Sequence, residues 1–313
     1  MALYIVRRSL SVIPVMVLVA FLVFALLYVA PGDPAEILAG DNATLEHIAA
    51  IRKSLGLDQP FFVRFLSWLA EVARGDLGAS VFSGKPVLEL IASRLEPTFS
   101  LMALTLVFSI STAIPLGILA ANYAGSWIDR VVMSFAIFGF SVPVFATGYL
   151  LAYVFAIELK WFPIQGYAPL SRGVGVWLSH LILPAISLGS VYMALIARIT
   201  RASMLEVLNQ DYVRTARAKG QSRINILFIH ALKNAAVSIV TVIGLGMALL
   251  IGGAVVTESV FAIPGIGRLT IDAILQRDYP IIQGVVLFFS FIYVVVNLLV
   301  DIAYTLIDPR IRY

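Results

Sequence analysis

The chain has 313 residues, of which 60% are hydrophobic and 13% are charged, and its formal net charge is +4. Soluble domains carry about 25% charged residues, and a chain of this length cannot bury so much apolar surface from water, so lipid must act as its solvent. The absence of cysteine excludes disulfides, thiol nucleophiles and cysteine-based metal sites. We expect the small positive charge to reflect cytoplasmic loops and not nucleic-acid binding.

A membrane-spanning helix needs about 20 mostly apolar residues. We therefore predict an all-α polytopic membrane protein with six spans, at residues 9–30, 98–121, 131–157, 176–197, 236–260 and 281–304. Arg7 and Arg8 precede the first span and favour a cytoplasmic N-terminus. The C-terminus then also lies in the cytoplasm. A cleaved signal peptide is the alternative for residues 1–30, but an apolar run of about 21 residues exceeds the usual 7–15.

The spans divide the chain into three parts. Residues 1–30 hold the N-terminus and first span, residues 31–95 form an extracytoplasmic helical segment, and residues 96–313 form a five-helix core. The extracytoplasmic segment has eight acidic and six basic residues, a balance of −2 that suits the outer side.

Three helices are expected in the extracytoplasmic segment. The first carries apolar residues at Leu45, Ile48, Ile51 and Leu55 and stops at Gly56, whereas Pro60 and Pro86 open the others. Gly75-Asp-Leu-Gly78 predicts a turn. The segment either packs on the spans as a cap or meets a ligand or delivery protein at the mouth of a pore.

Motifs for chemistry are missing from the sequence. The stretch from Gly78 to Pro86 has one residue too many between its glycines for a phosphate-binding loop, and no H-E-x-x-H or G-x-S-x-G occurs. Glu258 and Asp301 lie near span ends and not at the membrane midplane, which argues against a proton-coupled carrier. Asn297 either bonds to a neighbouring helix or lines a path for a polar solute.

Small residues recur along the fifth span at Gly244, Ala248 and Gly252. Such a strip lets helix backbones approach closely. It serves either internal packing or a subunit interface or translocation path, and the sequence leaves both open.

The loop 198–235 interrupts the apolar sequence with seven basic and two acidic residues, a surplus of +5 that predicts a cytoplasmic position. We predict two short helices separated at Gly220, a residue suited to the left-handed end of a helix. In the first, Tyr212, Val213 and Ala216 share one face. Ser222 caps the second, whose apolar stripe is Ile224, Leu227, Phe228 and Ala231.

The loop resembles the EAA loop of ABC-importer permeases. Arg214-Thr-Ala216 stands at the E-A-A triplet, Gly220 at the glycine that follows, and His230-Ala-Leu-Lys233 at the terminal motif. The departures resemble the B-type permeases of the dipeptide, oligopeptide and nickel branch. The likeness continues along the chain at Tyr4–Arg8, Pro31–Pro34, Leu55–Pro60, Gly75–Gly78, Pro264–Gly267, Arg277–Pro280, Asn297–Asp301 and Asp308–Arg312.

This resemblance implies a type I ABC-importer permease fold in the bacterial inner membrane. It implies a second homologous permease, two ATP-binding subunits that bind ATP and Mg²⁺ in the cytoplasm, and an extracytoplasmic solute-binding protein. This chain would bind no cofactor and catalyse no reaction. The residues expected to couple it to an ATPase are Asp211, Arg214, Ala216, Arg217, Gly220, Arg223 and His230, and the packing or pore candidates are Gly244, Ala248, Gly252, Asn297 and Asp301.

Dipeptides or short oligopeptides are the expected solutes, with glutathione and nickel as alternatives. Three other classes compete with the importer: a standalone carrier or channel, an intramembrane enzyme, and a receptor-like membrane protein. A carrier usually shows a repeat or a midplane charge, and an intramembrane enzyme needs facing polar residues at depth. The sequence shows neither pattern.

Overall fold

A computed structural model describes residues 2–29, 35, 44–54 and 58–307. The described residues form helices and loops, with one isolated β-bridge between Ala79 and Pro86. The motifs Pro31–Pro34 and Asp308–Arg312 and the predicted helix end at Leu55 and Gly56 lie outside the described residues. The chain divides into two compact units, one of Met1–Ser93 with Thr270–Val294 and the other of Arg94–Leu269 with Val295–Tyr313.

The first unit contains α1 (Ala2–Val29), α3 (Leu45–Ser54), α4 (Phe61–Ala73) and α5 (Val87–Ala92). Pro60 and Pro86 each stand at the position before a helix, as the sequence predicts. Phe65 of α4 is 7% exposed and packs with Ala20, Phe24 and Leu287. Aromatic burial of this kind attaches the predicted extracytoplasmic segment to the first helix.

Within the first unit, the segment that begins with the Gly75–Gly78 motif contacts the Arg277–Pro280 motif. Gly75 and Gly78 both adopt positive φ, of 87° and 79°, which confirms the predicted turn. Beyond it, the Ser80 hydroxyl donates to Asp278 at 2.6 Å. Asp278 is fully buried between α13 (Ile266–Gln276) and α14 (Tyr279–Ile307).

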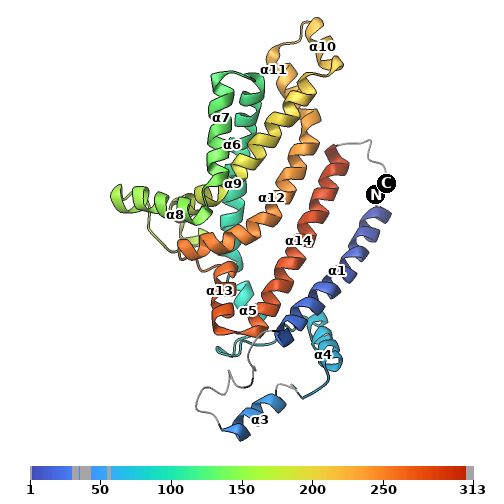
Figure 1. The fold of residues 1–313 in the computed structure, drawn as a ribbon, viewed down its shortest axis with the longest axis vertical. Coiled ribbons are helices and arrows are strands. Elements are labelled where there is room, and N and C mark those ends of the chain that lie inside the picture. The colour runs from blue at the N-terminus through green and yellow to red at the C-terminus, as the bar shows by residue number, and fades with distance from the viewer. Residues whose placement is uncertain (1, 30–34, 36–43, 55–57, 308–313) are drawn as a thin grey trace. The chain divides into compact units, whose positions relative to one another are not determined.

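The second unit is a bundle around α9 (Val174–Leu208). This helix packs against α6 (Leu95–Asn122), α7 (Trp127–Ser141), α8 (Val144–Leu151) and α12 (Lys233–Val260) (Figure 1). The core of the bundle includes Leu101, Leu181, Leu188, Tyr192 and Leu250. In lipid, van der Waals packing of such side chains, and not their removal from water, holds the helices together.

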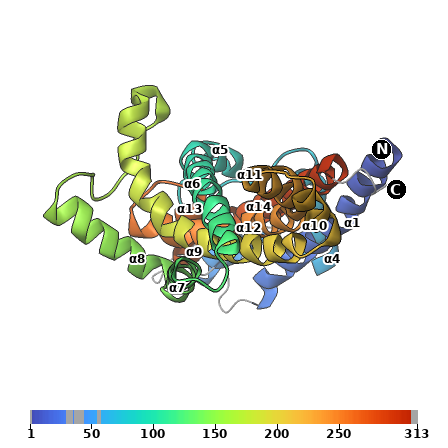
Figure 2. The same ribbon diagram turned by 90° about the horizontal axis from the view of Figure 1, so that it is seen from above.

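Four described segments are long and apolar enough to cross a membrane: Val87–Asn122, Val174–Leu208, Arg223–Met247 and Tyr279–Ile302. The predicted span 131–157 is different, because α7 and the segment Val144–Glu158 meet at a bend of 102°. Figure 2 shows α8 leaving α7 sideways. Pro143 causes the break, since Val142 before it is extended and α8 begins after it. Counting this pair as one span gives five, and the number six stays a prediction.

A buried carboxylate closes the bundle at the start of α6. Glu258 is fully buried; its side chain accepts from the Thr98 hydroxyl at 2.7 Å and from the Arg268 backbone N–H at 3.0 Å. A Cβ on Gly265 would come within 2.2 Å of this carboxylate. The glycines of Pro264–Gly267 therefore let the backbone close over Glu258.

Candidate functional site

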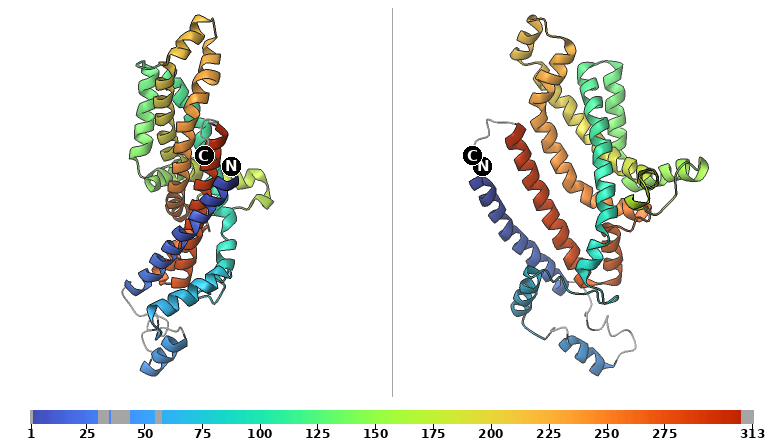
Figure 3. Two further views of the ribbon diagram at one scale, coloured as in Figure 1. Left: turned by 90° about the vertical axis from the view of Figure 1, so that its right-hand side faces the viewer. Right: turned by 180° about the vertical axis from the view of Figure 1, so that it is seen from behind.

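The predicted coupling loop forms a helical hairpin at the end of α9. Two residues separate its first helix, α10 (Asp211–Ala218), from the end of α9, because Gln210 is extended with ψ 150°. Next come the short α11 (Arg223–Asn225), the π-helix η3 (Ile226–Leu232) and α12. Figure 3 shows this hairpin extending past the ends of α6 and α7.

One face of α10 is buried and fixes the helix on the bundle. Val213 is 0% and Ala216 8% exposed, and α10 packs on η3. An apolar cluster joins η3 to α6, α9 and α12 and includes Ile118, Met204, Ala231 and Ala235. Tyr212, predicted to share a face with Val213 and Ala216, is 44% exposed while those two are buried. Partial burial still raises the pKa of its phenol.

The other face of α10 is charged and open. Arg214 Nη1 lies 3.2 Å from Asp211 Oδ1, and the two side chains are 73% and 94% exposed. Arg217 is exposed on the same helix. Such exposed pairs contribute little to stability, so this face leaves its charges available to a partner.

Gly220 makes the corner after α10. Its φ is +76°, and the Gly220 and Gln221 N–H groups donate to the Arg217 and Ala216 carbonyls at 3.0 and 3.2 Å. This is a Schellman motif, in which a left-handed residue satisfies the last carbonyls of a helix. The predicted role of Gly220 in ending the helix is confirmed.

The second predicted helix differs in its buried stripe. Ser222 caps α11 as expected, accepting from Asn225 N at 3.3 Å. Leu227 and Ala231 are buried as predicted, but Ile224 and Phe228 are 68% and 54% exposed and Ile226 is buried instead. The reason is η3: a π-helix bonds i to i+5 and brings residues five apart, such as Ile226 and Ala231, onto one face.

Half-buried His230 lies in η3, where its carbonyl accepts from Asn234 Nδ2 at 2.6 Å.

A groove of about 550 Å³ opens beside the hairpin. Its lining includes Asn122 of α6, Leu208 of α9, and Arg217, Gln221 and Arg223 of the loop. The Arg223 guanidinium donates to the Asn122 side chain at 2.8 Å and to the Asn122 carbonyl at 2.9 Å. The loop is thus attached to the end of α6.

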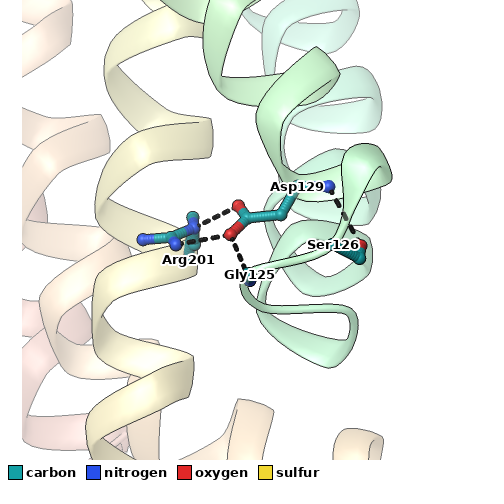
Figure 4. A network of polar contacts seen from close by, with 4 residues as sticks. All are labelled: Gly125, Ser126, Asp129 and Arg201. Carbon is teal, nitrogen blue, oxygen red and sulfur yellow. Dashed lines mark hydrogen bonds and ion pairs between the residues drawn. The ribbon is translucent and has the colours of Figure 1, made fainter.

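A salt bridge lies nearby between α7 and α9 (Figure 4). Arg201 donates through Nε and Nη2 to the two Asp129 oxygens, at 2.5 and 2.6 Å. Asp129 is a functional candidate that was not predicted from the sequence. The signal was an acidic residue three positions after Ser126, the helix-capping pattern, but nothing in the sequence pairs it with Arg201, 72 positions away.

The candidate packing residues have different surroundings. A Cβ on Gly244 would come within 2.4 Å of Val300, whereas Gly252 is exposed and has open space around it. Gly244 thus lets the Val300 side chain of α14 approach the backbone of α12, and Gly252 faces outward from the bundle. Asn297 and Asp301 are half-buried on α14. The side chain of Ala248 lies outside the described residues.

Known proteins match this chain over its whole length. Residues 113–313 match the family "Binding-protein-dependent transport system inner membrane component", and residues 1–102 match its N-terminal companion family. The "Probable peptide ABC transporter permease protein y4tP" of Sinorhizobium fredii is 55% identical over 100% of both chains. The glutathione transport system permease protein GsiC of Salmonella typhi is 43% identical over 99% of each.

The fold has a solved counterpart. A chain of the MetNI methionine ABC transporter, in a structure described as inward facing, has a TM-score of 0.59 at 15% identity, covering 70% of this chain and 96% of that one. Helical architecture and apolar segments together define a multi-pass membrane protein with an ABC-importer permease fold.

The chain belongs to the family of binding-protein-dependent transport system inner membrane components. It is a permease subunit of an ABC importer and not the catalytic subunit, because ATP hydrolysis in these machines belongs to separate ATPase subunits.

Proposed function

We propose that this permease forms half of the translocation pore of a peptide importer, and that α10 docks on an ATPase subunit. The observation that carries the docking is the arrangement of α10, with a buried face on the bundle and an exposed charged face beyond it. A helix fixed on one side can transmit a displacement into the bundle. ATP and Mg²⁺ bind to the partner subunits, whose movement α10 follows.

The complete assembly comprises this chain, a second permease, two ATP-binding subunits and an extracytoplasmic solute-binding protein. We place it in the bacterial inner membrane, with six spans and both termini in the cytoplasm. The basic surplus of loop 198–235 supports this orientation.

Short peptides are the proposed solutes. The name of the relative from Sinorhizobium fredii, 55% identical, supports a peptide, and the GsiC relative, 43% identical, makes glutathione the second candidate. Nickel is a third alternative. Competition between a labelled dipeptide and glutathione for uptake by the complete importer decides between the first two.

The docking proposal predicts a severe defect for Gly220→Val. Valine is strained at φ +76°, so the corner deforms and α10 no longer meets the ATPase correctly. In proteoliposomes that contain the complete importer, ATP-driven uptake should fall at least about tenfold. A factor of this size corresponds to a typical free energy of coupling between two sites. Assembly should be only partly reduced.

Gly84→Val is the matched control, since Gly84 has φ +67° and equally open surroundings away from the loop. It imposes similar strain and should retain most of the uptake. Full uptake by Gly220→Val would contradict the docking proposal.

A further inference from the structure

Helices α6 and α7 have no direct chain connection to the coupling loop, yet the turn between them is bound from two sides. The loop continues α9 and leads into α12. The turn lies between Asn122, the last residue of α6, and Trp127, the first residue of α7. Two arginines hold this turn, one preceding α10 in the chain and one following it.

Arg223 holds the α6 side of the turn. Its contact with the Asn122 carbonyl satisfies one of the acceptors that a helix leaves unpaired at its C-terminus, where a positive charge is also favoured. The guanidinium lies 5.3 Å from the Tyr123 ring centroid, within the range of a cation–π contact. Two hydrogen bonds and one ring contact thus join the loop to the end of α6.

Arg201 holds the α7 side. Its two hydrogen bonds occupy both oxygens of Asp129, whose Oδ2 also accepts from the Gly125 backbone N–H at 2.9 Å. The Asp129 N–H in turn points to the Ser126 hydroxyl at 3.5 Å. One carboxylate therefore closes the turn and binds α9 at the same time (Figure 4). The Asp129 side chain is 6% exposed and that of Arg201 28%. Water therefore competes little for the salt bridge, and the two helices stay joined when the loop moves.

We propose that Arg201 and Arg223 are positioning residues that make the α6–α7 turn move together with the coupling loop. The inference rests on the proposed docking of α10. When an ATPase displaces α10, α9 and α12 follow through the chain itself, whereas α6 and α7 follow through these two arginines. Without them the loop moves while part of the pore wall stays behind.

The test uses the complete importer in proteoliposomes with Arg201→Lys, Arg223→Ala and the two combined. Lysine keeps the charge but loses the two-point contact with the carboxylate. We expect the ATPase subunits to stay bound, and uptake per ATP hydrolysed to fall several-fold in each single variant and roughly tenfold in the double variant. Arg198→Ala is the control, because Arg198 lies one turn earlier on α9 and contacts the Phe140 ring instead; it should keep wild-type coupling.

A distance measurement separates joint movement from a loss of stability. The chain has no cysteine, so spin labels at Trp127→Cys and Ile224→Cys, which are 73% and 68% exposed, report one distance from α7 to the loop. In the wild-type background this distance should be the same with and without a non-hydrolysable ATP analogue. In the double variant the analogue should shift or broaden it.

An unchanged distance in the double variant, or wild-type uptake per ATP with the ATPases bound, would overturn the role of the two arginines alone. Full uptake by Gly220→Val would instead overturn the docking on which that role rests. The two failures are thus distinguishable.

Discussion

Two carboxylates hold opposite ends of the same bundle in different ways. Glu258 contacts Thr98 at the start of α6, whereas Asp129 lies just after Asn122, the last residue of α6. Thr98 and Asn122 are roughly 36 Å apart along the helix. Glu258 is enclosed by a hydroxyl, a backbone N–H and two glycines. Asp129 binds a partly exposed arginine.

The difference separates a fixed end from an end that transmits movement. A carboxylate packed against glycine backbone has no other arrangement available, because interiors are close-packed and cannot deform continuously. An arginine salt bridge near the surface can shift with its helices and keep its bonds. The predicted outer end of the bundle is therefore built for rigidity, and the end at the coupling loop for transmission.

The largest expected effect on stability comes from Glu258→Ala. It leaves the Thr98 hydroxyl and the Arg268 N–H without their acceptor, and each unsatisfied buried donor costs about 1–3 kcal/mol before the cavity is added. The unfolding temperature in detergent should fall strongly. Glu258→Gln, which keeps the shape and one acceptor oxygen, should lose less; equal stability of the alanine variant and the wild type would refute the rigid closure.

A smaller loss is expected for Asp129→Ala. Breaking a buried salt bridge costs about 3–5 kcal/mol, but Arg201 is 28% exposed and water can solvate it afterwards. The decrease in unfolding temperature should therefore be smaller than for Glu258→Ala. Relative to that decrease, the loss of ATP-coupled uptake should be larger for Asp129→Ala than for Glu258→Ala. The comparison fails if Asp129→Ala destabilises the protein as much as Glu258→Ala does.

Local features were predictable from the sequence where one residue type decides the backbone. Pro60 and Pro86 mark helix starts, and Gly220 marks a helix end, because φ is restricted in proline and free in glycine. The salt bridge of Asp129 with Arg201 was not predictable, since it depends on how α7 and α9 pack. The apolar stripe predicted after Gly220 was right at Leu227 and Ala231 and wrong at Ile224 and Phe228. The reason is related: the expected period of 3.6 residues does not hold in the π-helix η3.

The bend within the predicted span 131–157 was also not predictable from the sequence. Its composition is apolar throughout, and a proline such as Pro143 is tolerated within many membrane helices. Composition cannot distinguish a kink from a bend of 102°, because the bend depends on what the two halves pack against. Glu258 and Pro264–Gly267 were likewise each noted in the sequence, but their contact emerges only in the fold.

Cross-linking at α10 is the most direct test of the central claim that its exposed face meets an ATPase. With no native cysteine to interfere, Arg214→Cys in membranes should cross-link to single-cysteine ATPase subunits and change its yield when ATP is added. Phe82→Cys, 53% exposed in the predicted extracytoplasmic segment, should not. Labelling of Arg214→Cys by a membrane-impermeant thiol reagent from outside the cell, with no cross-link to the ATPase, would contradict the account.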